Sequence, residues 1–248
     1  MMRKSVIFLA LLGWAAGLLA GDFPDGQEIL RKVDENIRAR NRVVTAKMVI
    51  GGRRGNRTIV SKTWAEGDKR SFTEYLSPAR EKGTKMLKLE DELWTYTPAT
   101  DRTIRISGHM LRQSVMGSDL SYEDMMEADL LSDAYQAEVI ADTTLGERPV
   151  WVLELTARGK DVSYARRRVW VDRERYLALR EERFASGGKL LKRTEVEGVM
   201  RVDERWVVSQ VRFKDMLKSG EGTLFIIEEV AFDVDIPASR FSKAALKR

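Results

Sequence analysis

Apolar and polar side chains alternate along most of the chain after residue 43, and this pattern predicts a long succession of β-strands. In the first such segment, residues 44–50, one face carries Val44, Ala46, Met48 and Ile50. Gly51-Gly52 ends that segment, and Gly187-Gly188 separates two later ones. The count is about ten or eleven strands, which favours a strongly curled antiparallel sheet or barrel.

The final strand segment, residues 222–234, has a conspicuous apolar parity. Its even-numbered positions carry Leu224, Ile226, Val230, Phe232 and Val234. Glu228 interrupts this run, and Pro237 ends it. Strict alternation therefore predicts that the even-numbered side chains all face the core.

A helical period appears at residues 25–40, before the first strand. Its apolar positions recur three and four residues apart, at Ile29, Leu30, Val33 and Ile37. Asp25 followed by Glu28 resembles a capping box at the start of the helix. Such an apolar stripe is expected to pack on the sheet.

A second helical region interrupts the strands at residues 111–131 and differs in composition from the rest of the chain. It is rich in methionine and in acids, at Met116, Met125, Met126, Asp119, Glu123, Asp124, Glu127 and Asp129. Between Gln113 and Glu147 there is no Lys or Arg, although the chain has 43 of them. The whole insert, at about 108–131, is predicted to form a helical lid over an apolar site.

The helical phase divides the insert into two faces. Ser121 with Asp124 marks a helix start, and the apolar face then carries Tyr122, Met125, Met126 and Leu130. Glu123, Asp124 and Glu127 fall elsewhere and are predicted to form a solvated outer face. Methionine and aromatic side chains adapt to irregular apolar ligands. The candidate ligand-binding residues are Met116, Tyr122, Met125, Met126 and Leu130 of the insert, with Phe72, Trp94 and Tyr96 of the preceding strands. The alternative, that individual members are simply core residues, stays open.

The N-terminus has the pattern of a secretory signal peptide. Arg3 and Lys4 precede an apolar run, and charge returns at Asp22. We expect residues 1–20 to be a cleaved signal peptide, and residues 21–248 to form a single domain in the periplasm. The chain has no cysteine, so it has no disulfide and no acylated N-terminal Cys of a lipoprotein. The net charge of +5 is compatible with contact with an anionic membrane surface.

Residues for catalysis, metal binding and nucleic-acid binding are largely missing from the sequence. His109 is the only histidine, which argues against His-dependent triads and multi-His metal sites. The acids of the insert lack the order of a calcium-binding loop. In the run at residues 166–168, alternation places Arg166 and Arg168 on one strand face and Arg167 on the other, so they do not form one nucleic-acid patch. We therefore expect a protein without catalytic residues, metal or cofactor, whose function is binding.

Two segments carry a family resemblance. MGSDLSYEDM at residues 116–125 and LWTYTPATDRTIRI at residues 93–106 resemble the LolA/LolB superfamily, in the branch of outer membrane lipoprotein-sorting proteins. The similarity extends from Asp25 to about Phe241. It implies a half-open antiparallel β-barrel in which helices cover an apolar cavity.

The resemblance also implies a function. The expected role is a periplasmic carrier that binds lipid or lipoprotein acyl chains and transfers them between the envelope membranes. Its expected partners are these acyl chains, with an inner-membrane transporter or an outer-membrane acceptor, and the protein is expected to be a monomer. The alternative is a non-enzymatic envelope sensor or interaction module on the same fold.

Overall fold

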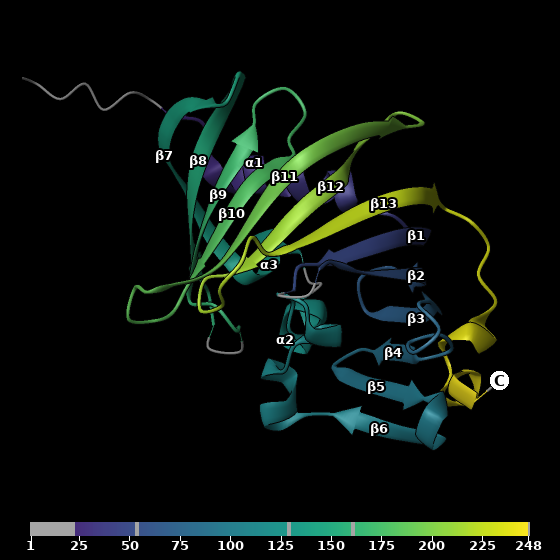
Figure 1. Cartoon of the computed structure of the whole chain (residues 1–248). Helices are drawn as coiled ribbons and strands as arrows, with labels where there is room; N and C mark the ends of the chain where they lie inside the picture. The colour runs from purple at the N-terminus through teal and green to yellow at the C-terminus, as the bar shows by residue number, and fades with distance from the viewer. Residues whose placement is uncertain (1–22, 53–54, 128–129, 160–161, 248) are drawn as a thin grey trace, which may run out of the picture.

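The computed structural model describes residues 23–52, 55–127, 130–159 and 162–247 (Figure 1). The expected signal peptide, residues 1–20, lies outside the described part of the chain. Among the described residues, no helix is both long and apolar enough to cross a membrane.

One antiparallel sheet of thirteen strands organises the described residues, in the order β6-β5-β4-β3-β2-β1-β13-β12-β11-β10-β9-β8-β7. Consecutive strands pair with each other except β6 and β7, which are the two edges of the sheet, and β13 returns to pair with β1, which joins the two halves. The strands are β1 (Asn41–Ile50), β2 (Arg57–Glu66), β3 (Arg70–Ser77), β4 (Lys85–Leu89), β5 (Glu92–Thr97), β6 (Arg102–Ile106), β7 (Tyr135–Leu145), β8 (Arg148–Ala157), β9 (Arg166–Asp172), β10 (Ala178–Phe184), β11 (Leu190–Val202), β12 (Arg205–Asp215) and β13 (Thr223–Phe232). The sheet curves strongly and does not close, as Figure 1 shows. The predicted curved antiparallel fold is confirmed, with more strands than the ten or eleven expected.

Helix α1 (Gly26–Ile37) packs on the inner face of the sheet, which is the face inside its curve. Asp25 caps the helix by accepting a hydrogen bond from the Gln27 backbone N–H at 2.9 Å. The apolar stripe is buried against β7, β8 and β9 through Ile29, Leu30 and Val33. A Cβ at Gly26 would lie 2.9 Å from the Ala137 carbonyl oxygen, so glycine allows the helix to approach β7 closely.

The insert is helical, as predicted, and consists of four short pieces. They are η2 (Gly108–Arg112), η3 (Val115–Gly117), α2 (Tyr122–Met126) and α3 (Leu131–Ala134). Ser121 and Asp124 form the expected capping box at the start of α2. Figure 1 shows α2 and α3 inside the curve of the sheet, so the insert covers part of its inner face.

The C-terminal segment covers part of the opposite, outer face. Two 3-10 turns, η4 (Ala238–Phe241) and η5 (Lys243–Lys247), follow β13. Phe241 and Leu246 are buried there against Phe72, Leu87 and Trp94. The sheet between β2 and β5 is therefore covered on both faces.

Replacing Leu246 with alanine is expected to destabilise the protein by ~2–5 kcal/mol, because its side chain is fully buried and the cavity left behind cannot be filled by water. Urea unfolding followed by tryptophan fluorescence measures the change. Lys247→Ala is the matched control, since the Lys247 side chain is largely exposed and its substitution should cost less than about 0.5 kcal/mol. Equal stabilities for the two variants would show that the C-terminal turns do not contribute to the core.

Candidate functional site

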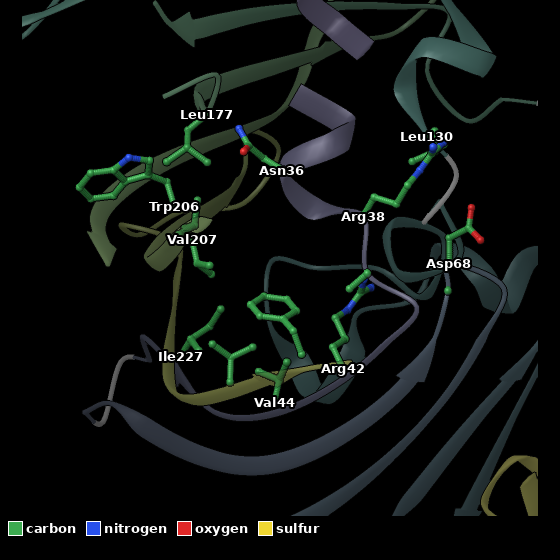
Figure 2. A pocket seen from close by; sticks show the side chains of 15 residues that line it. Asn36, Arg38, Arg42, Val44, Asp68, Leu130, Leu177, Trp206, Val207 and Ile227 are labelled. Atoms are coloured by element: carbon green, nitrogen blue, oxygen red, sulfur yellow. The ribbon is translucent and has the colours of Figure 1, made fainter. Parts of the chain in front are cut away.

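A cavity of about 520 Å³ lies on the inner face of the sheet, between the end of α1 and strands β1, β12 and β13 (Figure 2). Most of its wall is apolar, provided by Ala39, Val44, Leu130, Leu177, Trp206, Val207, Val208, Ile227, Val230 and Phe232. Its volume falls within the ~300–1,000 Å³ typical of small-molecule sites. The geometry is that of a half-open apolar pocket.

Strand register explains why β1 and β13 provide this wall. The inner-face row of β1 continues from Val44 into Ala46 and Met48, as alternation predicts. On β13, register shifts at Glu228, so Val44 pairs with Val230 whereas Ala46 pairs with Ile227. Because directly opposed side chains point to the same face, Val230 and Ile227 both lie on the inner face.

The prediction that Leu224 and Ile226 share a face with Val230 is therefore wrong. The bulge at Glu228 reverses the parity, and Phe225 and Ile227 take the inner positions instead. A single extra residue on one strand moves every side chain before it to the other face. The polar interruption at Glu228 was the visible signal for this bulge.

Polar residues gather at one end of the cavity. Figure 2 shows Arg38, Arg42 and Asp68 on the side opposite Trp206 and Ile227. Burial lowers the pKa of the Arg42 guanidinium, and the nearby Asp68 carboxylate offsets only part of that effect. Within the described ranges, neither Arg38 nor Arg42 has an ion-pair partner. The site thus combines an apolar wall with a cationic end.

The predicted residues of the insert lie on the inner face, as expected, but only one of them lines this cavity. That residue is Leu130. The other four, Met116, Tyr122, Met125 and Met126, pack beside the cavity against a cluster that includes Met48, Ile59 and Tyr75. Burial raises the pKa of Tyr122, consistent with an apolar environment. The insert therefore contributes to the core of this half of the sheet and borders the cavity through Leu130.

Phe72, Trp94 and Tyr96 lie on the outer face, away from the insert. Phe72 and Trp94 are buried beneath Phe241 and Leu246 of the C-terminal turns, and Tyr96 packs against the same cluster. Tyr75, at the opposite parity of β3, takes the inner-face position instead. The structure thus does not bring these three side chains to the cavity, because both faces of strands β2 to β5 are apolar and covered.

Two acids of the insert, Asp124 and Glu127, do not lie on the solvated outer face predicted for them, and Asp129 lies outside the described residues. The Asp124 side chain is only 2% exposed, and it accepts hydrogen bonds from Tyr164 at 2.8 Å and from Arg183 at 3.0 Å. Glu127 accepts from Arg167 and from the Ser163 backbone N–H. These carboxylates instead face inward and attach the insert to strands β9 and β10.

The partners of these acids form a buried ion cluster, which we define as Asp124, Glu127, Arg167, Glu181 and Arg183. Glu181 lies between the two arginines, at 2.7 Å from Arg167 and 2.9 Å from Arg183. Burial alone would raise the pKa of Glu181, but the charges of Arg183 and Arg167 outweigh it and hold that pKa at about 2. Glu181 is therefore ionised at neutral pH.

Asp119, earlier in the insert, attaches it to β12 and β13, in the same half of the sheet as the ion cluster. Its carboxylate accepts from the Thr223 hydroxyl at 2.9 Å and from the Asp215 backbone N–H at 3.0 Å. Lys218 donates to the Ser118 carbonyl oxygen at 2.6 Å. The insert thus spans the inner face: its apolar side chains pack toward β1 to β6, and its carboxylates bond toward β9 to β13.

The alternation argument for the arginine run is confirmed. Arg166 and Arg168 both pair with Glu154 on the outer face, whereas Arg167 points inward to the ion cluster. An inward-facing charge on an otherwise apolar strand face was the available signal for the cluster. The cavity residues Trp206, Val207 and Phe232 were not predicted, because nothing in their spacing distinguishes them from core residues.

Comparison with known proteins identifies the fold. A family model described as "-like: Uncharacterized protein" matches residues 67–248, while no curated protein matches the chain. A DUF1329 family protein from Desulfovibrio piger has 26% identity and a TM-score of 0.80, covering 89% of this chain and 97% of that one. A putative outer membrane lipoprotein-sorting protein domain from Vibrio parahaemolyticus has 23% identity and a TM-score of 0.79, covering 90% and 98%. The LolA superfamily protein NE2245 from Nitrosomonas europaea has 23% identity and a TM-score of 0.74, covering 90% and 100%. The predicted resemblance is confirmed: the chain belongs to the family of the matching model, and its fold is that of the LolA superfamily.

Proposed function

We propose that this protein is a non-catalytic carrier that shelters acyl chains of lipids or lipoproteins in the inner-face cavity. The observation that carries the proposal is the half-open apolar cavity between α1, β1, β12 and β13. The LolA-like fold, shared with a putative lipoprotein-sorting domain, supports the same role. We propose the periplasm as its compartment, with transfer between the two envelope membranes.

Hydrophobic burial supplies the affinity in this proposal. An acyl chain of about sixteen carbons gains roughly a dozen kcal/mol gross, at ~0.8 kcal/mol per buried CH₂. Association and ordering costs reduce that gain considerably. The remaining affinity suits a carrier, which must release its cargo to an acceptor.

The position of the insert suggests how loading is controlled. Leu130 borders the cavity, and the preceding helix α2 is attached to the sheet through Asp124 and Glu127. We propose that displacement of the insert widens the cavity so that a chain can enter or leave. Hydrogen bonds and ion pairs suit this role because they form again with the same partners, in the same geometry, each time the insert returns to the sheet.

Ile227→Trp tests the proposal. The indole should fill part of the cavity, reduce co-purified lipid in native mass spectrometry and weaken binding of a fluorescent fatty acid by ~10-fold or more. Ile226→Trp is the matched control, because its side chain lies on the outer face of the same strand, opposite Lys47. Lipid content and affinity that are the same in both variants, or a wild-type protein that binds no acyl probe, would contradict the proposal.

A further inference from the structure

Arg42 is a charged residue in an apolar row of the inner face. The row of β1 runs from Arg42 through Val44 and Ala46 into the core. The direct cross-strand neighbours of Arg42 are Ala65 on β2 and Phe232 on β13. A half-buried guanidinium among such neighbours is costly unless something compensates its charge.

The described residues supply no such compensation by direct contact. Asp68 influences Arg42 through space, yet the described part of the chain holds no hydrogen bond or ion pair to the Arg42 guanidinium. This contrasts with the ion cluster under the insert, where both arginines are paired with carboxylates at hydrogen-bond distance. Arg42 therefore points into the cavity with hydrogen-bond donors to spare.

Two further arginines contact aromatic residues of the cavity wall. Arg175 lies 4.3 Å from the ring centre of Trp206, and Arg205 lies 5.0 Å from that of Phe232. Arg205 is paired with Asp233, whereas the described residues provide no ion-pair partner for Arg175. Among the residues that line the cavity, the two cations Arg38 and Arg42 outnumber the one carboxylate, Asp68, so the lining carries a net positive charge.

We propose that the cavity selects anionic amphiphiles, with the acyl chain against the apolar wall and an oxyanion headgroup, phosphate or carboxylate, at Arg42. This inference rests on the proposed carrier function and narrows its cargo. The planar guanidinium matches phosphate and carboxylate oxygens in a bidentate geometry. Asp68 is the one carboxylate among the described residues that line the cavity, and it cannot neutralise both Arg38 and Arg42. A neutral headgroup would leave the Arg42 donors unsatisfied, and a cationic headgroup would be repelled.

Binding of four probes with the same sixteen-carbon chain tests the inference, namely hexadecyl phosphate, palmitate, the neutral glycerol monoether and hexadecyltrimethylammonium, each below its micelle concentration. The wild-type protein should bind at least one anionic probe ~10-fold more tightly than the neutral one, as expected for a charge-assisted hydrogen bond. The phosphate and carboxylate arms distinguish the two sources of the oxyanion.

Arg42→Gln should abolish the preference and leave affinity for the neutral probe unchanged, while Arg42→Lys should keep part of it. Arg212→Gln is the control, because Arg212 lies on the outer face opposite Leu224 and should not affect the preference. Equal affinities for anionic and neutral probes in the wild-type protein, or an equal loss for both in Arg42→Gln, would overturn the inference while the carrier function stands. Binding of none of the four would overturn both.

Discussion

Replacing Arg183 with methionine is expected to lower the free energy of unfolding by ~3–5 kcal/mol, because it leaves the buried carboxylates Asp124 and Glu181 without a main partner. The Arg183 side chain is only 14% exposed, so water cannot replace the lost hydrogen bonds. The second consequence is local. Helix α2 loses its attachment to β10, and its amides should exchange with solvent faster than those of the sheet.

Urea unfolding measures the stability change, and hydrogen exchange of residues 120–126 measures the release of the insert. Arg180→Met is the matched control: it removes an arginine from the same strand, but the pair it breaks, with Glu195, is about one-third exposed. That pair should be worth less than about 1 kcal/mol. Equal losses in the two variants, with α2 still protected in Arg183→Met, would show that the ion cluster does not hold the insert.

A double-mutant cycle isolates the contact between Asp124 and Arg183. Asp124→Asn and Arg183→Gln each leave a buried group unpaired, so the double variant should be more stable than the sum of the two losses predicts. A coupling free energy of ~1–3 kcal/mol is expected for residues in direct contact. Additive losses would mean that each side chain acts through other partners.

Local sequence patterns were sufficient to predict the curved antiparallel sheet, but they did not always predict on which face of the sheet a side chain lies. The opposite orientations of Arg167 and its two neighbours followed from alternation alone, because β9 has no bulge in this run. In β13, the same rule failed at Glu228, where one extra residue exchanges the inner and outer sets. Alternation is therefore reliable only between bulges, and a bulge is a tertiary feature of two paired strands.

Long-range partners account for the other differences. Asp124 lies 59 residues before Arg183 and 40 before Tyr164, so helical phase around α2 could not show that its carboxylate is buried. Phe72 and Trp94 were predicted to line the ligand site, but they are covered by the C-terminal turns, which come from the far end of the chain. The missing cations between residues 113 and 147 did carry information, because the strands opposite the insert supply the positive charge instead.

Acidification is expected to destabilise the protein through the ion cluster, in the window between about pH 4.5 and about pH 2. The pKa of Glu181 falls from 4.5 to about 2 on folding, because Arg183 and Arg167 outweigh the effect of burial. A carboxyl whose pKa is lower in the folded state contributes its stability above the unfolded pKa and loses it as the pH falls toward the folded pKa. The contribution at neutral pH is roughly 3 kcal/mol at ~1.4 kcal/mol per pKa unit.

Asp124 changes in the same direction, since Arg183, Ser121 and Lys192 together outweigh its burial and lower its pKa. Urea midpoints of the wild-type protein and of Glu181→Gln, measured from pH 7 to pH 2, separate Glu181 from the other carboxylates. The variant should be much less stable at pH 7, because Arg167 and Arg183 lose a shared counter-ion, and its stability should fall less steeply with acid. The two curves are therefore expected to converge as the pH approaches 2. Parallel curves would contradict the prediction and assign the acid sensitivity to carboxylates other than Glu181.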